Sequence, residues 1–178
     1  MTDKSDSGKG LIMVYTGDGK GKTTAAIGQA VRMMGHGWKV LMVHFMKGRD
    51  YGEFFPLIDF PGVTIVKGGR DEFVCRENPD PYDVELARNG FAEAQKAIYG
   101  GEYDMVVLDE INVALDFGLL ELDDVMEVLQ KKPEKVDVVL TGRNASPQII
   151  EIADMVSEVK EIKHHYQKGV VNRKGIEF

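Results

Sequence analysis

Short apolar runs alternate with longer segments in which apolar residues recur every three or four positions. A continuous apolar run bounded by polar residues or glycines predicts a buried strand, and the wider spacing predicts a helix with one buried face. The predicted buried strands cover residues 11–15, 39–45, 103–110 and 136–142, and residues 63–68 are predicted to form a further short strand. The predicted helices cover residues 23–34, 83–99, 122–130 and 146–153. Residues 155–163 alternate apolar and polar, which predicts a more exposed strand near a sheet edge.

The order of these elements indicates the fold class. Strands that alternate with helices, most of them apolar throughout, predict an α/β fold with a mostly parallel sheet and helices on both faces. Residues 46–62 are predicted to be mostly loop, and residues 111–118 fit neither helix nor loop clearly. We find no internal repeat or linker, so the pattern predicts one domain over residues 10–178 after a flexible tail at residues 1–9. Ligands of such sheets bind beyond the carboxyl ends of the strands.

The composition of the chain argues against several classes of protein, among them nucleic-acid-binding, disulfide-bonded and membrane proteins. The chain has 178 residues, and 29 acidic against 22 basic side chains give a net charge of −7. This balance argues against a protein that binds nucleic acid through bulk charge. The single cysteine, Cys75, excludes an internal disulfide and a cysteine zinc cluster. No apolar run resembles a signal peptide or a membrane span, so we predict a cytoplasmic chain with no membrane contact.

The sequence TGDGKGKTT, residues 16–24, lies between the first predicted strand and the first predicted helix, and we call it the phosphate loop. The standard phosphate-binding pattern places a glycine five positions before the final Gly-Lys-Thr. That position is Thr16, and the nearest glycine, Gly17, comes one place late. The context of strand, glycine-rich turn and helix still predicts a phosphate site, because loop N–H groups and the helix N-terminus attract anions.

Side chains of the phosphate loop add chemistry to this backbone site. Lys22 is predicted to reach the phosphates, and the Thr23 hydroxyl is predicted to bind Mg²⁺. Lys20 adds a second positive charge that many such loops lack. The alternative interpretation is a plain turn with two solvated lysines. The residues predicted to bind ATP are Thr16, Gly17, Asp18, Gly19, Lys20, Gly21, Lys22, Thr23, Thr24 and Arg143.

Two other strand ends are predicted to meet the loop at the same sheet edge. The run MVVLDE ends in Asp109 and Glu110, which we expect near the metal. Neighbours on a strand point in opposite directions, so one acid would bind the metal, directly or through water, and the other would orient it. Arg143, after Thr141 and Gly142, is expected on the phosphates or the sugar, with a solvated surface arginine as the alternative.

Three reactions are compatible with such a site. A kinase transfers the terminal phosphate to a hydroxyl, usually with a carboxylate that takes the proton. A nucleotide-driven assembly or nucleic-acid module needs a positioned water and a partner surface. A third reaction attacks the ribose 5′ carbon and expels triphosphate, which demands stabilisation of leaving-group charge. Abundant positive charge in one loop, without an obvious acid–base pair, favours the third reaction slightly.

Motifs along the chain resemble those of the P-loop ATP:corrinoid adenosyltransferases, which make adenosylcobalamin. The phosphate loop matches the family's T-G-x-G-K-G-K-T-T, and the resemblance extends from residue 10 to the end of the chain. The other matching segments are A-x-R-x-x-G-H-G at 30–37, F-x-K-G at 45–48, G-E at 52–53, D-M-V-x-L-D-E at 104–110, T-G-R at 141–143, A-D-x-V-S-E at 153–158, K-H-x-[FY]-x-x-G-V at 163–170 and G-I-[DE]-[FY] at 175–178.

The resemblance implies a single RecA-like P-loop domain, usually a homodimer, that transfers the adenosyl group of ATP to Co(I) of a corrinoid and releases triphosphate. Carried over to this chain, it implies that Lys22 stabilises the leaving group without acid–base catalysis. It implies Mg²⁺ or Mn²⁺ at Thr23 and Glu110, with Asp109 beside them. Reduction of Co(II) to Co(I) implies reduced flavodoxin or a similar electron donor.

One segment departs from the family. Close relatives carry a G-F-x-W type segment after the third strand, whose aromatics face the corrinoid, and residues 68–78 lack the tryptophan. Phe73 is the candidate to replace one aromatic, and Lys47, after the second strand, is the other residue expected near the corrinoid.

Overall fold

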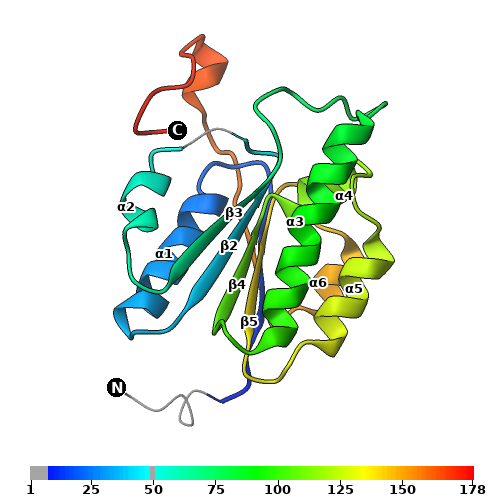
Figure 1. Cartoon of the computed structure of the whole chain (residues 1–178). Helices are drawn as coiled ribbons and strands as arrows, with labels where there is room; N and C mark the ends of the chain where they lie inside the picture. The colour runs from blue at the N-terminus through cyan, green and yellow to red at the C-terminus, as the bar shows by residue number, and fades with distance from the viewer. Residues whose placement is uncertain (1–7, 49–50) are drawn as a thin grey trace.

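A six-stranded parallel sheet forms the centre of the molecule (Figure 1). The computed structural model describes residues 8–48 and 51–178. The strand order is β3-β2-β4-β5-β1-β6, so the two edge strands are β3 and β6. The strands are β1 (Ile12–Thr16), β2 (Val40–Phe45), β3 (Val63–Gly68), β4 (Met105–Asp109), β5 (Asp137–Thr141) and β6 (Met155–Glu158). The predicted parallel α/β architecture is confirmed.

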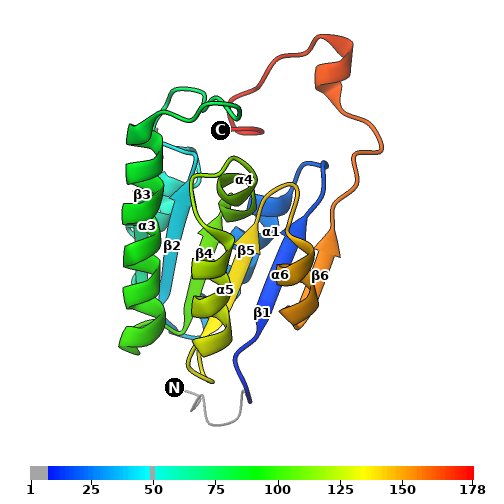
Figure 2. The ribbon, with the colours of Figure 1, turned by 90° about the vertical axis from the view of Figure 1, so that its right-hand side faces the viewer.

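Helices cover both faces of this sheet (Figures 1 and 2). Helices α1 and α2 lie on one face, and the other α-helices lie on the opposite face. The helices are α1 (Lys22–Gly35), α2 (Phe54–Ile58), α3 (Pro81–Gly100), α4 (Ile111–Asp116), α5 (Leu122–Lys131), α6 (Pro147–Ile152) and the 3₁₀ helix η2 (His165–Lys168). None of the helices among the described residues is long and apolar enough to cross a bilayer.

The continuous apolar runs of the strands are explained by two separate cores. Successive side chains of a strand point to opposite faces of the sheet. In β4, Met105 and Val107 pack into the core under α1, whereas Val106 and Leu108 pack into the core under α3. A strand covered on both faces must be apolar at every position, and this requirement produces the pattern seen in the sequence.

Three segments differ from the sequence prediction. Residues 46–62 contain α2 in place of a continuous loop, because Phe54 and Leu57 lie on one helical face and are buried. Pro56 fits the first turn, where a backbone N–H has no helical partner. Residues 111–118, ambiguous in sequence, begin with α4. The predicted strand 155–163 ends early at Glu158, because the chain turns toward the phosphate loop at Val159.

The observed first residues of α6 and α3 lie close to the starts predicted from the sequence. The Ser146 hydroxyl accepts a hydrogen bond from the Gln148 N–H at 3.3 Å, with Pro147 at the first helical position, as predicted. Helix α3 begins slightly earlier than predicted, because Asp80 accepts a hydrogen bond from the Tyr82 N–H at 2.8 Å. The flexible tail predicted at residues 1–9 lies outside the described residues except for its last two positions.

The carboxyl ends of the strands meet at one edge of the sheet, where the ends of β1, β2, β4 and β5 carry the predicted site residues. The last part of the chain, residues 159–178, leaves β6 and crosses over this edge (Figures 1 and 2). We call it the C-terminal tail. The fold therefore brings the phosphate loop and the far end of the chain to the same place.

Candidate functional site

Glycines of the phosphate loop allow it to pack against the C-terminal tail. A Cβ atom on Gly17, whose φ is +95°, would lie 2.5 Å from the carbonyl oxygen of Val159. The Gly19 N–H donates a hydrogen bond to the same oxygen at 2.7 Å. Gly21, with φ of +119°, then turns the chain into α1. The late first glycine is thus required by the contact with Val159.

Lys22, the first residue of α1, is held inside the phosphate loop. Its Nζ donates a hydrogen bond to the Gly19 carbonyl oxygen at 2.8 Å, and only 7% of the residue is exposed. Burial lowers the pKa of Lys22, and the negative charge of Glu110, which would raise that pKa, only partly offsets the effect. The ammonium group is therefore positioned before any ligand arrives, and an anion in the adjoining pocket would compensate its lost hydration.

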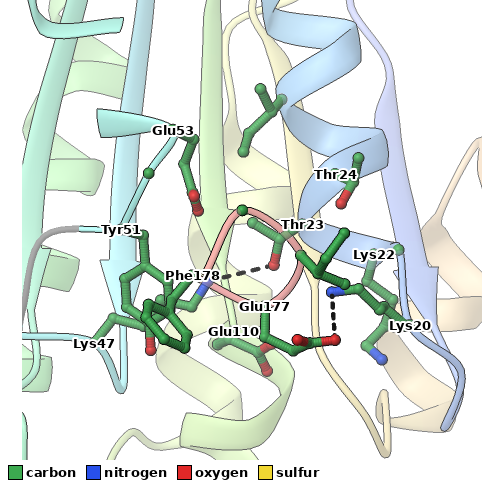
Figure 3. Close-up of a pocket in the computed structure, with 15 residues that line it drawn as sticks. Lys20, Lys22, Thr23, Thr24, Lys47, Tyr51, Glu53, Glu110, Glu177 and Phe178 are labelled. Carbon is green, nitrogen blue, oxygen red and sulfur yellow. Dashed lines mark hydrogen bonds and ion pairs between the residues drawn. The ribbon is translucent and has the colours of Figure 1, made fainter. Parts of the chain in front are cut away.

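A pocket of about 520 Å³ opens between α1, the end of β4 and the C-terminal tail (Figure 3). Lys20 and Lys22 lie on one side of it, and Tyr51 and Phe178 lie on the other. It therefore has a cationic side and an aromatic side, a combination that suits a nucleotide. The pocket is lined by Lys20, Gly21, Lys22, Thr23, Thr24, Ile27, Lys47, Tyr51, Gly52, Glu53, Glu110, Gly175, Ile176, Glu177 and Phe178.

Asp109, the last residue of β4, connects the strand ends beneath this pocket. It is completely buried, and its Oδ1 accepts hydrogen bonds from the Thr23 hydroxyl at 2.8 Å and the Thr141 hydroxyl at 2.7 Å. The hydroxyl proton of Thr23 is thereby directed toward Asp109. The Thr23 oxygen accepts one long hydrogen bond from Lys47 Nζ, at 3.4 Å, and its remaining lone pair suits a metal ligand.

The second carboxylate oxygen of Asp109 binds two further groups. Its Oδ2 accepts hydrogen bonds from His44 Nδ1 at 2.9 Å and from Lys47 Nζ at 2.7 Å. Burial would raise the pKa of Asp109, but the charge of Lys47 and the hydrogen bond from His44 outweigh it and hold that pKa far below its ordinary value. Burial would lower the pKa of Lys47, but the charge and the hydrogen bond of Asp109 outweigh burial and raise that pKa above its ordinary value. The pair is therefore ionised.

Glu110 differs from Asp109 in its backbone conformation, its side-chain partners and the direction of its pKa shift. Its backbone has a left-handed φ of +62°, and its N–H donates a hydrogen bond to the Thr141 hydroxyl at 2.9 Å. Its carboxylate faces the pocket and forms no hydrogen bond or ion pair with any residue that the structure describes. Burial, together with the charge of Asp109, raises the pKa of Glu110 above its ordinary value. An unpaired, desolvated carboxylate beside the Thr23 hydroxyl provides the oxygen donors that Mg²⁺ prefers.

Arg143 reaches the phosphate loop from the end of β5. Its Nη2 donates a hydrogen bond to the Asp18 carbonyl oxygen at 3.3 Å, and its Nε lies 3.7 Å from the Asp18 carboxylate. These groups border a second hollow of about 280 Å³ that also includes Lys20 and Lys22. The two hollows flank the phosphate loop, so Arg143 is close to the loop but outside the larger pocket.

The two residues expected near a corrinoid lie in different surroundings. Lys47 lines the larger pocket and is largely buried against Asp109. Phe73 lies on the segment between β3 and α3 and is fully exposed. The structure thus brings Lys47, and not Phe73, to the phosphate loop.

Several residues of the site were not identified from the sequence. The phosphate loop is bordered by Gly175–Phe178 at the far end of the chain, and the closing G-I-E-F motif was the only signal for that segment. The Nδ1 of His44 donates a hydrogen bond to the central Asp109. The side chain of His165 approaches Glu177, a contact that their separation along the chain concealed.

Solved structures support the assignment of the fold. A KaiC-like protein from Pyrococcus horikoshii superposes with a TM-score of 0.55 at 17% sequence identity, covering 87% of this chain and 74% of that chain. The flagellar accessory protein FlaH from Methanocaldococcus jannaschii gives a TM-score of 0.53 at 13% identity, covering 88% and 76%. At such low identity, these similarities show the fold alone.

Sequence comparisons identify the family. Residues 8–178 match the family model described as ATP:corrinoid adenosyltransferase BtuR/CobO/CobP. The corrinoid adenosyltransferase of Pseudomonas aeruginosa is 37% identical over 96% of this chain and 84% of its own length. The corresponding proteins of a Sinorhizobium species and of Escherichia coli K12 are 38% and 36% identical, over 84% and 86% of their lengths. The chain belongs to the ATP:corrinoid adenosyltransferase family.

Proposed function

We propose that this chain transfers the 5′-deoxyadenosyl group of ATP to the Co(I) centre of a corrinoid and releases triphosphate. The observation that carries the proposal is the match to the family over residues 8–178. The pocket supports it, because Lys20 and Lys22 of the phosphate loop face a cavity whose size suits one nucleotide.

The reaction requires charge stabilisation more than proton transfer. The electron pair of Co(I) attacks C5′, a Co–C bond forms, and the C5′–O bond breaks with its electrons leaving on the triphosphate. The nucleophile carries no proton, so no general base is needed. We assign Lys22 to the departing triphosphate, because its ammonium group is already held in position by Gly19. Lys20 and Arg143 add positive charge on either side of the loop.

We also propose that Thr23 and Glu110 hold Mg²⁺, or Mn²⁺, which prefers similar oxygen donors. The metal would neutralise charge on the phosphates. Asp109 has both oxygens bound by protein donors, so we assign it to orienting the Thr23 hydroxyl and not to direct coordination. This division supports the hypothesis from sequence that one acid binds the metal and the other orients it.

A Glu110→Gln variant is expected to need roughly tenfold more Mg²⁺ for half-maximal activity, because a charged metal ligand is lost. Its melting temperature is expected to stay close to wild type, since the wild-type carboxylate has no partner among the described residues. A metal titration of the activity measures the first effect. Glu53→Gln, on the opposite wall of the pocket, is the matched control. An unchanged titration in Glu110→Gln would show that Glu110 does not bind the metal.

The reaction itself is tested by its products. The protein is incubated with Mg-ATP and a chemically reduced corrinoid, and the nucleotide products and the corrinoid spectrum are analysed. We expect triphosphate and a light-sensitive cobalt–carbon bond in equal amounts. ADP would indicate phosphoryl transfer by a kinase, and AMP or an unaltered corrinoid would equally contradict the proposal.

We also propose an electron donor, a cellular location, corrinoid contacts and an oligomeric state, each from a single observation. Reduced flavodoxin or a similar donor would supply the electron for Co(I), and the use of ATP suits a cytoplasmic location. Lys47 and Phe73 remain our candidates for corrinoid contacts, because one lines the pocket and the other is an exposed aromatic on the segment between β3 and α3. A homodimer is supported by Phe55 and Ile58, which expose apolar surface on one face of α2.

A further inference from the structure

The end of the C-terminal tail forms one wall of the nucleotide pocket (Figure 3). Residues 173–178 fold into a tight turn in which the N–H groups of Ile176 and Glu177 both donate to the Arg173 carbonyl oxygen, at 3.1 and 3.0 Å. The Gly175 N–H donates to the Phe178 carbonyl oxygen at 2.7 Å. This turn places the Glu177 side chain against the phosphate loop.

Glu177 provides a negative charge where a phosphate would be attracted. Its side chain is only 12% exposed, and its Oε1 lies 3.8 Å from Lys20 Nζ and 3.3 Å from His165 Nε2. Its Oε2 accepts a hydrogen bond from the Arg173 N–H at 2.7 Å. That hydrogen bond, with the charge of Lys20, lowers the pKa of Glu177, so the carboxylate is ionised at neutral pH.

We infer that Glu177 competes with the triphosphate for Lys20, so that ATP displaces the tail on binding and Glu177 returns to Lys20 as triphosphate leaves. One ammonium group cannot fully compensate both anions, and a carboxylate beside the triphosphate would repel it. The inference rests on the proposed role of the phosphate loop. It adds to the proposed reaction a residue that weakens nucleotide binding and favours release of the product.

The tail is suited to such a movement. None of the buried residues in the two hydrophobic cores comes from residues 159–178, so displacement of the tail costs little apolar burial. Ile162, Tyr166 and Val171 expose most of their surface. The pocket bordered by the tail measures about 520 Å³, a volume that suits a nucleotide, and the corrinoid ring is much larger. Displacement of the tail by ATP would therefore also open the site to the second substrate.

The binding of inorganic triphosphate to the full chain tests the competition. Glu177→Gln removes the charge but keeps an oxygen that can accept the Arg173 hydrogen bond, so the turn is preserved. We expect Glu177→Gln to bind triphosphate roughly two- to fivefold more tightly than wild type, the range typical of a weak ion pair at a protein surface, as measured by calorimetry. Glu127→Gln is the matched control, since it removes the same charge from an ion pair with Lys131 on α5. Equal or weaker binding by Glu177→Gln would overturn the inference.

Hydrogen exchange of the wild-type tail tests the displacement. Once Glu177 no longer contacts Lys20, the internal hydrogen bonds of the turn are expected to open more often, so the amides of Gly175, Ile176 and Glu177 should exchange faster when triphosphate is bound. Unchanged or slower exchange would overturn the displacement of the tail. If wild-type protein failed to bind triphosphate at all, the proposed role of the phosphate loop would fail as well, so the two failures are distinguishable.

Discussion

Replacement of Lys22 by alanine is expected to abolish the use of ATP while the fold stays intact. The Nζ of Lys22 is fixed by the Gly19 carbonyl oxygen and is largely shielded from water, so its charge acts on the triphosphate with little screening. Removal of one preorganised donor from such a site typically costs about 10²- to 10³-fold in turnover. Formation of the cobalt–carbon bond from saturating Mg-ATP measures the loss.

Stability separates this effect from unfolding. Loss of Lys22 leaves only the Gly19 carbonyl oxygen without its donor, and water in the adjoining pocket can replace it. The melting temperature is expected to fall by no more than about 2 °C. Lys39→Ala, which removes a lysine paired with Glu102 at the opposite end of β2, is the matched control and should be fully active. Retained activity in Lys22→Ala with a normal melting profile would refute the assigned role.

The sequence predicted the sheet and its ligand-binding edge because both follow from local signals. Each buried strand is a continuous apolar run, and each run ends in the polar residues that face the site, such as Asp109 and Thr141. Helix α2 escaped prediction because only Phe54 and Leu57 define its buried face, and Pro56 and nearby glycines suggested a loop. A five-residue helix is decided by tertiary packing more than by propensity.

The unusual glycine spacing of the phosphate loop was recognised in the sequence, but its structural cause was not. Thr16 in place of the first glycine was visible in the sequence, but the contact between Gly17 and Val159 depends on a segment far along the chain. The same limit applies to Glu177, whose proximity to Lys20 arises only when the C-terminal tail crosses the sheet edge. Contacts of high sequence separation have no local signature, so the geometry of the site required the structure.

The roles of the two adjacent acids illustrate this limit most sharply. From the strand-end pattern alone, Asp109 and Glu110 were equivalent candidates with opposite orientations, and only the family resemblance favoured Glu110 as the metal ligand. In the structure, Asp109 accepts hydrogen bonds from four side chains, whereas the carboxylate of Glu110 has no such partner among the described residues. The difference arises from the left-handed backbone at Glu110, which turns its side chain into the pocket.

Asp109→Asn is therefore expected to destabilise the protein strongly, unlike Glu110→Gln next to it. The substitution leaves Lys47, which is 12% exposed, without its anion and places an amide donor among groups that are themselves donors. Removal of one partner from a buried ion pair typically costs about 3–5 kcal/mol, which corresponds to a fall in melting temperature of roughly 10 °C or more. Thermal unfolding of the two variants side by side measures the contrast.

The pH dependence of unfolding provides an independent test of the same network. The pKa of Asp109 is lowered by folding, so the stability it contributes is present above the unfolded-state value near pH 4 and is lost as the pH falls below it. The difference in unfolding free energy between wild type and Asp109→Asn is thus expected to be constant near neutral pH and to shrink below about pH 4. A difference that stayed constant into acid would show that the Asp109 carboxylate is not the anion that stabilises Lys47 and His44.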